Sequence, residues 1–562
     1  MSQVQNFRLS SKSVKIRFIC VICVLFVLSG IDIYAQTPRI PSENPRLIVG
    51  IVIEQMRSDY ISRFWDKFGE GGFKRLVQEG TWCRNASYNY FHTQTAVGYA
   101  TIYTGSMPVS HGIVGDEWYD RVSSKVTQAV SDESVKTVGG TFDAGHYSPR
   151  NMLGTTIGDE IKLTNFRQSK VFGVSLNPVS AILPAGHTAD GAFWYDIENG
   201  SWITSSYYMQ DLPNWLIDEN KKKLADLYLN KTWDTTFPVQ HYTSSLTDEN
   251  PYETGIDGRI VFPYVLPDIA RGRSISGRYQ LLKQTPFGNS LTKDMAIALM
   301  VNENLGKDEF TDLLAVSFVA TEYIGNAFGP LSIEVEDAFL KLDKDLEHFL
   351  QFIDEFAGMQ NTLIFVTSNH GVALTPAYLA DLKVPVGSFN YNSALALLRS
   401  YLNALYGSGG WIKGYFGQQL YLNSDLIENS KMKLDDVRNT VALFLVQFTG
   451  VSNTITATAL LNNQYTEGYR SKMQNNYFPR RSGDVFVNLH PGWVEKSERV
   501  TSHNSAYPYD AQVPLIWYGW KVKRDMIMRP IDMTDVAPTI SSMMNMMVPN
   551  AATGKVIEEL VK

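Results

Sequence analysis

Short runs of apolar, mostly β-branched residues recur along the chain, and segments with helical spacing of apolar residues separate them. Such runs predict strands that are buried on both faces, because nearly every residue along them is apolar. The alternation of strands and helices indicates an α/β fold, with a mostly parallel central sheet covered by helices on both faces. The predicted core strands are residues 47–53, 170–176, 313–319, 363–367 and 513–519.

Two long tracts lack this alternation. Residues 192–284 are rich in Tyr, Trp, Asn and Asp, which predicts a cap inserted into the fold. Residues 373–481 form a second insertion-rich tract, with a helix predicted at 434–449. A closing helix is predicted to begin near Asp535, since an acidic side chain favours the N-terminus of a helix. One large domain with insertions, residues 36–562, is therefore the expected organisation.

Residues 1–35 have the pattern of a secretory signal peptide. Basic residues precede the apolar run 18–28, and cleavage is expected after Ala35. The run is short for a membrane-spanning helix, which needs about 20 apolar residues, so an uncleaved anchor is the less favoured alternative. The mature chain is expected to have no transmembrane segment and to be periplasmic or secreted. It keeps only Cys83, which predicts a packed core thiol and no internal disulfide.

Composition and charge narrow the classes of function. The chain has 562 residues, of which 44% are hydrophobic and 19% charged, as in ordinary globular proteins. Its formal net charge of -7 gives no basic excess, which argues against nucleic acid as a partner. The function must therefore be sought in a site on a globular fold.

Polar residues directly follow four of the predicted strands. Ligands of open α/β sheets bind beyond the carboxyl ends of the strands, so these side chains are candidates for one site. They are Glu54, Asn177, Glu322, Asn326, Asn369 and His370.

Thr95 opens a segment of small residues at the start of a predicted helix. The N-terminus of a helix has unpaired backbone N–H groups, which favour an incoming anion. Thr95 is therefore a candidate nucleophile. A simple helix N-cap is the alternative role for this residue.

Ordered blocks along the chain carry a resemblance to a known family. They include QMRSDY, TAVGYATIYTGSMP, HGIVGDEWYD, ILPAGHTADGAFWYD, FGPLSIEVED and YPYDAQVPLIWYGW. With these blocks the chain resembles the alkaline phosphatase superfamily, which includes the type I phosphodiesterases and nucleotide pyrophosphatases, and most nearly its PafA-type monomeric phosphatases. The resemblance spans nearly all of the mature chain and implies a three-layer α/β/α fold with cap insertions. Function is a separate question, since one fold serves many activities.

The resembled family holds two zinc ions beside a Thr or Ser nucleophile, and the resemblance implies where their ligands fall in this chain. The ligands of the first ion fall on Glu322, Asn326 and His503. The ligands of the second ion fall on Glu54, Thr95, Asn369 and His370. Only Thr95, His370 and His503 keep the residue type of the family, so both metal sites are expected to be weakened. Amide oxygens favour harder ions than zinc, which makes magnesium or calcium the alternative metal.

The family's phosphate clamp, formed by Asn, Lys and Arg, falls on Asp116, Asn177 and Val179. Each of the three changes removes a positive charge or adds a negative one, which disfavours a phosphate dianion. Losing one well-placed donor costs about 10² to 10³ in rate, so efficient monoester hydrolysis is expected to be lost.

Three functions stay open at this point. The favoured one is a secreted phosphatase-like pseudoenzyme with impaired or lost phosphate-monoester hydrolysis. The second is an active metal-dependent phosphoric-ester hydrolase with Thr95 as nucleophile, a changed metal or substrate, and a small phosphate ester as its partner. The third is a glycan-binding envelope module that uses the aromatic residues within 194–233.

Overall fold

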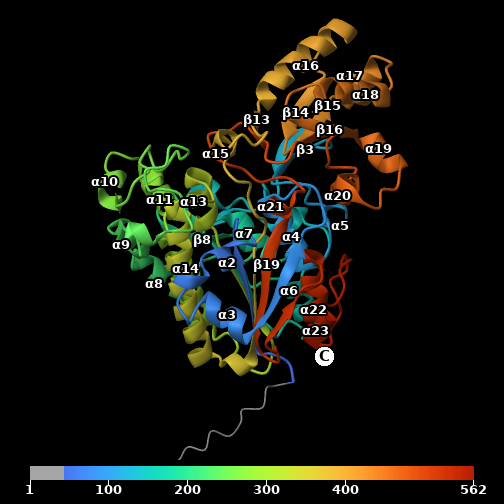
Figure 1. Ribbon diagram of the computed structural model, residues 1–562. Coiled ribbons are helices and arrows are strands. Elements are labelled where there is room, and N and C mark those ends of the chain that lie inside the picture. Colours follow the sequence, from blue (N-terminus) through green and yellow to red (C-terminus); the bar gives the residue numbers. More distant parts are fainter. Residues whose placement is uncertain (1–42, 562) are drawn as a thin grey trace, which may run out of the picture. The chain divides into compact units, whose positions relative to one another are not determined.

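The computed structural model describes residues 43–561, so the predicted signal peptide lies outside the described residues. Its centre is an 11-stranded sheet with the order β20-β2-β19-β12-β1-β11-β6-β7-β8-β5, and β21 pairs with β2 (Figure 1). Within the described part of the chain, no helix is long and apolar enough to cross a membrane. The strands of this sheet are β1 Leu47–Ile53, β2 Thr81–Ser87, β5 Thr137–Val138, β6 Val171–Ser175, β7 Gly191–Asp196, β8 Ser201–Ser205, β11 Asp312–Phe318, β12 Thr362–Thr367, β19 Gln512–Gly519, β20 Asp525–Ile527 and β21 Ile531–Asp532.

The five predicted core strands form and lie side by side in the middle of the sheet. β1 pairs in parallel with β11 and β12, and β11 pairs in parallel with β6. β19 runs antiparallel to β12, so the sheet is mixed around a parallel centre. The α/β class is confirmed. The parallel centre also brings the carboxyl ends of β1, β6, β11 and β12 to one edge, where the polar residues that follow them meet.

Successive residues of β1 serve two separate hydrophobic cores, because neighbouring side chains of a strand point to opposite faces of the sheet. Val49 and Ile51 belong to one core, whereas Ile48 and Val52 belong to the other. The second core includes buried residues of the helices α4 Thr95–Thr104, α6 Ile157–Thr164, α7 Pro178–Ala185 and α22 Val536–Met543.

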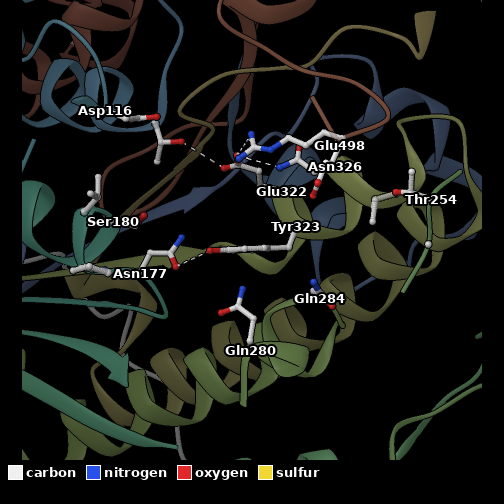
Figure 2. A pocket seen from close by; sticks show the side chains of 16 residues that line it. Asp116, Asn177, Ser180, Thr254, Gln280, Gln284, Glu322, Tyr323, Asn326 and Glu498 are labelled. Atoms are coloured by element: carbon white, nitrogen blue, oxygen red, sulfur yellow. Dashed lines mark hydrogen bonds and ion pairs between the residues drawn. The ribbon is translucent and has the colours of Figure 1, made fainter. Parts of the chain in front are cut away.

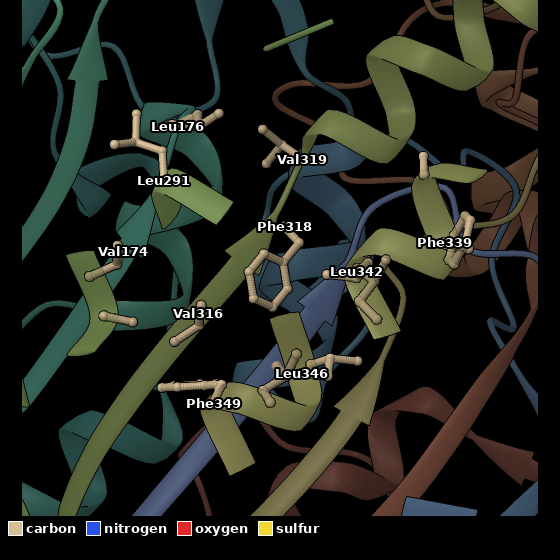
Figure 3. Packing of buried hydrophobic residues seen from close by; sticks show 14 of the residues in the cluster. Val174, Leu176, Leu291, Val316, Phe318, Val319, Phe339, Leu342, Leu346 and Phe349 are labelled. Atoms are coloured by element: carbon tan, nitrogen blue, oxygen red, sulfur yellow. The ribbon is translucent and has the colours of Figure 1, made fainter. Parts of the chain in front are cut away.

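The first core is covered by the long helix α14 (Ile333–Phe356). Leu342 and Leu346 are four residues apart and therefore lie on one face of the helix. They pack over Val316 and Phe318 of β11 in the same cluster (Figure 3). Helices on both faces thus sandwich the sheet, as the predicted three-layer arrangement requires.

The first predicted insertion, 192–284, differs from the prediction at its start. Residues of β7 and β8 belong to the central sheet, since β7 pairs with β6 and β8 pairs with β7. Their aromatic, half-polar sequence concealed these strands, although Trp194 and Trp202 are buried. The part outside the sheet therefore starts after Ser205 rather than at residue 192. It contains α8 Asn214–Lys221, α9 Leu224–Leu229, β9 Thr232–Trp233, β10 Tyr264–Val265, α10 Leu266–Ala270 and α11 Ile275–Lys283.

The second tract contains a small separate sheet with the order β14-β15-β17-β16 and its own hydrophobic core. The helix predicted at 434–449 forms and ends earlier, at Leu445. The strand β17 lies beyond residue 481, so the folded unit extends past the predicted tract. Its elements are β13 Ser388–Phe389, α16 Tyr391–Tyr406, β14 Ile412–Phe416, β15 Gln419–Leu422, α17 Ser424–Asn429, α18 Leu434–Leu445, β16 Val451–Thr456, α19 Ala457–Asn462, α20 Gly468–Asn476, β17 Val485–Leu489 and β18 Val494–Glu495.

Two smaller predictions are confirmed. Cys83 is fully buried in β2, and Asp535 is the N-cap residue of α22. The elements not yet named are α2 Tyr60–Arg63, α3 Phe73–Glu79, α5 Pro108–His111, β3 Glu117–Asp120, β4 Lys125–Gln128, α12 Phe287–Glu303, α13 Ala320–Phe328, α15 Pro376–Asp381, α21 Pro508–Ala511 and α23 Glu558–Val561.

Candidate functional site

Three of the residues that follow the core strands, Asn177, Glu322 and Asn326, line a cavity of about 520 Å³ at the carboxyl edge of the central sheet. Figure 2 shows Asp116 and Glu322 towards the top of this cavity and Asn177 and Gln280 below them. The structure thus brings together residues that lie far apart in the sequence. The lining residues are Thr95, Asp116, Asn177, Pro178, Val179, Ser180, Thr254, Gly255, Gln280, Gln284, Glu322, Tyr323, Asn326, Ala327, Glu498 and Arg499.

Thr95 is the first residue of α4, and the N-cap residue is Gln94, so the alternative that Thr95 caps the helix is wrong. The hydroxyl of Thr95 lies 3.5 Å from Oε2 of Glu322 and 3.4 Å from Nε2 of His370. These contacts direct the hydroxyl towards the candidate metal ligands. Its role as a nucleophile stays a prediction.

Glu322, His370 and His503 form a cluster whose ligand atoms all lie within 4.8 Å of one another. Nε2 of His503 is 3.4 Å from Oε1 of Glu322, and Nε2 of His370 is 3.9 Å from Oε2 of the same carboxylate. The two imidazole rings stack with their centroids 3.6 Å apart. The resemblance assigned the two histidines to different zinc ions, whereas here they gather around one carboxylate.

The backbone holds both histidines in the orientation that a metal ligand needs. Nδ1 of His370 lies 2.8 Å from the carbonyl oxygen of Gly371, and Nδ1 of His503 lies 2.7 Å from that of Thr93. A carbonyl only accepts, so Nδ1 carries the proton in each ring. Nε2 is then left to face Glu322 as a metal donor, which is how carbonyls commonly orient metal-binding imidazoles.

The protonation states of the cluster follow from burial and mutual charge. Burial alone would raise the pKa of Glu322, but the hydrogen bond with His503 and the charges of both histidines hold it well below its usual value. Burial lowers the pKa of His370 to about 3. Burial opposes the charged form of His503 as well, yet the hydrogen bond and the charge of Glu322 outweigh it and raise the pKa of His503. The carboxylate is therefore anionic, and one of the imidazoles is neutral.

Glu54, at the second metal position, forms hydrogen bonds with neighbouring side chains. It is fully buried, and its Oε1 accepts hydrogen bonds from the hydroxyls of Ser180 at 2.5 Å and Tyr99 at 3.0 Å. Burial, followed by the negative charge of Glu322, raises the pKa of Glu54 well above its usual value. Oε2 has no hydrogen-bond donor among the described residues, which fits an oxygen that carries the proton. Glu54 thus binds a proton more tightly than an exposed glutamate does.

Gln55 engages both amide oxygens that replace metal ligands. Its backbone N–H donates to Oδ1 of Asn369 at 3.3 Å, and its side-chain amide donates to Oδ1 of Asn326 at 3.0 Å. Gln55 has φ 61°, in the left-handed region that a side chain adopts only at a cost of about 1 to 3 kcal/mol. Sequence reasoning missed this residue, although its place directly after Glu54 was a usable signal.

Asp116 occupies the N-terminus of α4. Its Oδ1 accepts a hydrogen bond from the backbone N–H of Ala96 at 2.8 Å. Burial raises the pKa of Asp116, while this hydrogen bond acts in the opposite direction. A carboxylate of the chain therefore already binds one of the N–H groups that favour an anion. Val179 forms an apolar part of the cavity wall at the position of the clamp arginine, and it packs against the second hydrophobic core.

Asn177 takes the place of the clamp lysine and is tied to two neighbours. Its Oδ1 accepts hydrogen bonds from Nζ of Lys283 at 2.9 Å and from the hydroxyl of Tyr323 at 3.2 Å. Sequence reasoning missed Lys283, because it comes from α11, within the tract predicted as a cap. Arg499 lines the cavity as well, with Nη1 4.0 Å from Oε1 of Glu322.

The donors present fit one divalent transition metal. The cluster of Glu322, His370 and His503 offers one carboxylate and two correctly oriented imidazoles, which is a common three-residue set for zinc. Three other oxygens implied as ligands accept hydrogen bonds from the protein: Oε1 of Glu54 from two hydroxyls, and Oδ1 of Asn326 and Oδ1 of Asn369 from Gln55. The residues therefore fit a single metal better than the pair of ions in the resembled family.

Comparisons with known proteins agree with the resemblance. The profile of the type I phosphodiesterase / nucleotide pyrophosphatase family matches residues 48–506. Alkaline phosphatase PhoV of Synechococcus elongatus is 38% identical over 561 residues, which cover 98% of this chain and 100% of that protein. Alkaline phosphatase PafA of Elizabethkingia meningoseptica is 37% identical over 541 residues, which cover 96% of this chain and 98% of that protein.

A solved structure gives the same result for the fold. The crystal structure of wild-type alkaline phosphatase PafA matches with a TM-score of 0.88 at 37% identity, and the match covers 92% of this chain and 99% of that one. The predicted alkaline-phosphatase-like architecture is therefore confirmed. The chain belongs to the type I phosphodiesterase / nucleotide pyrophosphatase family of the alkaline phosphatase superfamily.

Proposed function

We propose that this protein has lost the two-metal hydrolysis of phosphate monoesters and acts by binding a ligand in the cavity at the carboxyl edge of the sheet. One observation carries the proposal: two ligand oxygens at the second metal position already accept hydrogen bonds inside the protein, Oε1 of Glu54 from Ser180 and Tyr99 and Oδ1 of Asn369 from Gln55. Two-metal catalysis needs one ion at the attacking oxygen and one at the leaving oxygen. A chain with donors for one ion can place a metal at only one of these two oxygens.

The charges of the cavity wall support the same proposal. Asp116, Glu322 and Glu498 are acidic, and Arg499 is the one basic residue among the residues that line the described cavity. A phosphate dianion would meet three carboxylates in a partly enclosed site, where like charges repel more strongly than in water. Phosphoryl transfer depends mainly on electrostatic stabilisation of negative charge, so this wall opposes it.

A metal in the cluster of Glu322, His370 and His503 would supply positive charge and Lewis acidity beside Thr95. Zinc is the ion that this donor set favours, because imidazole and carboxylate ligands suit it. The protein's own contribution is to keep His370 neutral and Glu322 ionised, so that both can donate to a cation.

The test is the zinc content and the monoesterase activity of the mature chain from residue 36. After loading with zinc and exhaustive buffer exchange, we expect about one zinc per chain. We also expect no hydrolysis of 4-nitrophenyl phosphate above that of the Thr95→Ala variant, and loss of the zinc in His503→Ala. Two zinc ions per chain together with hydrolysis that depends on Thr95 would refute the proposal.

An active metal-dependent phosphoric-ester hydrolase is the second candidate. It is favoured by the position of the Thr95 hydroxyl, 3.5 Å from Glu322 and 3.4 Å from His370. Hydrolysis of a phosphate diester by the zinc-loaded protein, abolished in Thr95→Ala, would support it. The glycan-binding alternative has little support, because Trp194, Trp202 and Trp233 are buried and offer no stacking surface.

A further inference from the structure

A buried lysine, Lys283, contacts Asn177, the residue that takes the place of the clamp lysine of the resembled phosphatases. Lys283 is the last residue of α11 and is 7% exposed. Its ammonium group donates to Oδ1 of Asn177 at 2.9 Å, which is its one hydrogen bond to the described residues. Lys162 and Lys293 form ion pairs with carboxylates, and Lys170 donates to the backbone carbonyl oxygen of Glu303. Lys283 differs from these three lysines because its ammonium group faces the side-chain amide of a residue that lines the cavity.

This contact determines which way the amide of Asn177 points. An ammonium group only donates hydrogen bonds, so the atom that faces it is the amide oxygen. The hydroxyl of Tyr323 donates to the same oxygen at 3.2 Å (Figure 2). The Nδ2 group is therefore turned away from both partners. Asn177 lines the cavity, and its Nδ2 has no partner among the described residues, so the N–H groups are available to a ligand.

The floor of the cavity near Asn177 is neutral and polar. Gln280 of α11 and Gln284, the C-cap residue of this helix, line it, and Gln280 lies three residues before Lys283 on the same side of the helix. The acidic residues Asp116 and Glu322 lie on the other side of the cavity in Figure 2. A ligand in this cavity thus meets hydrogen-bond donors at the floor and carboxylates opposite.

We propose that Lys283 is a positioning residue that acts through Asn177: it polarises the amide and presents a strengthened N–H donor to an acceptor oxygen of the ligand. This rests on the proposed function, because it specifies what the binding cavity recognises. Asn177 separates the ammonium group of Lys283 from the cavity, so the electric field of this charge at the ligand is weaker than that of a lysine in direct contact. The cavity then favours a ligand with an acceptor oxygen and one negative charge, such as a phosphate diester, over a dianion.

A purely structural role does not account for this arrangement. A buried ammonium group without a carboxylate partner is unfavourable, and an apolar side chain would fill the same space at lower cost. Burial lowers the pKa of Lys283 to about 8, and the charges of Glu54 and Asp196 act in the opposite direction. The lysine is therefore charged at neutral pH.

The experiment is titration calorimetry of the mature chain from residue 36 at pH 7 with two probes, bis(4-nitrophenyl) phosphate and 4-nitrophenyl phosphate. We expect the diester to bind more tightly than the monoester. Lys283→Met should weaken diester binding by about tenfold, the value of one charge-assisted hydrogen bond. Lys293→Met is the matched control, because this lysine of α12 pairs with Asp345 and does not line the cavity; it should leave the affinity unchanged.

The Asn177→Asp variant should lower the affinity for the diester without lowering the melting temperature. The aspartate keeps an acceptor for Lys283 and Tyr323 and gains an ion pair with Lys283, so the melting temperature should not fall. It replaces the N–H donor with a second acceptor, so diester affinity should fall by about tenfold or more. Folded Lys283→Met and Asn177→Asp variants that bind the diester as tightly as the natural protein would overturn the inference, as would a natural protein that binds neither probe. Monoester hydrolysis would instead overturn the proposed function, and the diester affinities of the variants would still decide the role of Lys283.

Discussion

The residues at the two metal positions implied by the family resemblance differ in their burial and in their hydrogen bonds. At the first, Glu322 lines the cavity and forms one cluster with His503 and His370. At the second, Glu54 and Asn369 are fully buried and hydrogen-bonded to their neighbours. The difference teaches that nearby hydroxyls and amides can bind an oxygen of a changed ligand, here Oε1 of Glu54 and Oδ1 of Asn369, while Oε2 of Glu54 and Nδ2 of Asn369 have no partner among the described residues. Metal binding at such a position is disfavoured for two reasons: the original ligand is lost, and the protein's own hydrogen bonds use oxygen atoms that would bind the metal.

Restoring the family residues should give the largest effect. Seven changes together should raise kcat/KM for 4-nitrophenyl phosphate by at least about 10³-fold, because they return both metal charge and clamp donors. The three clamp changes alone should not raise it, since the second metal position would stay closed. The changes are, for the clamp, Asp116→Asn, Asn177→Lys and Val179→Arg, and for the metals, Glu54→Asp, Glu322→Asp, Asn326→His and Asn369→Asp. Activity after the clamp changes alone would show that the two positions do not differ as described.

Zinc affinity should separate the two positions directly. His503→Ala should lower the affinity by at least about 100-fold, because it removes one of three donors. Glu54→Gln should leave it within about threefold, since the buried carboxyl group has a raised pKa and its Oε1 is held by Ser180 and Tyr99. Competition with a chromophoric chelator measures both values. Equal losses in the two variants would mean that Glu54 is a ligand after all.

The free energy of unfolding should report the hydrogen bonds that Glu54 accepts at the second metal position. Ser180→Ala removes one of the two donors to the buried Oε1 of Glu54. Leaving this oxygen less satisfied should lower the free energy of unfolding by about 1 to 3 kcal/mol. Ser430→Ala, at an exposed site, should change it by no more than about 0.5 kcal/mol. Urea unfolding of the zinc-free protein gives both values, and a neutral Ser180→Ala change would argue against a closed position.

The smallest effect is expected in the pH dependence of the zinc-free protein. The pKa values of Glu54 and His503 are raised in the folded state above 4.5 and 6.5, so both groups stabilise the folded state most below those values. Their contributions are lost as the pH rises through the folded pKa values. Three buried histidines, His92, His111 and His370, have pKa values lowered to about 3 and act in the opposite direction up to about pH 6.5, so the melting temperature in EDTA should fall from about pH 7 to about pH 9. Glu54→Gln cannot lose a proton and should make this fall shallower. A steeper fall in that variant would contradict the raised pKa of Glu54 in the folded protein.

The sequence allowed much of the fold and part of the site to be predicted. The apolar runs that became β1, β6, β11, β12 and β19 were recognisable because a strand buried on both faces must be apolar along its length. β7 and β8 were not, because their Trp and Tyr residues combine apolar rings with polar atoms and gave no alternation. The strand ends pointed to Glu54, Glu322, Asn326, Asn369 and His370, since the chain direction at the edge of a parallel sheet follows from the strands themselves.

By itself, the sequence determined the α/β layers, the family and the fact that ligand and clamp residues had changed type. Only the tertiary structure decided what replaced them. Gln55 holds two asparagine oxygens, Ser180 and Tyr99 hold Glu54, and Lys283 stands behind Asn177. These contacts join residues that are up to 314 positions apart, and their outcome depends on distances and burial. A pattern of residue types carries no such information, because whether an oxygen binds a metal or a neighbouring hydroxyl is settled by which of the two lies within reach.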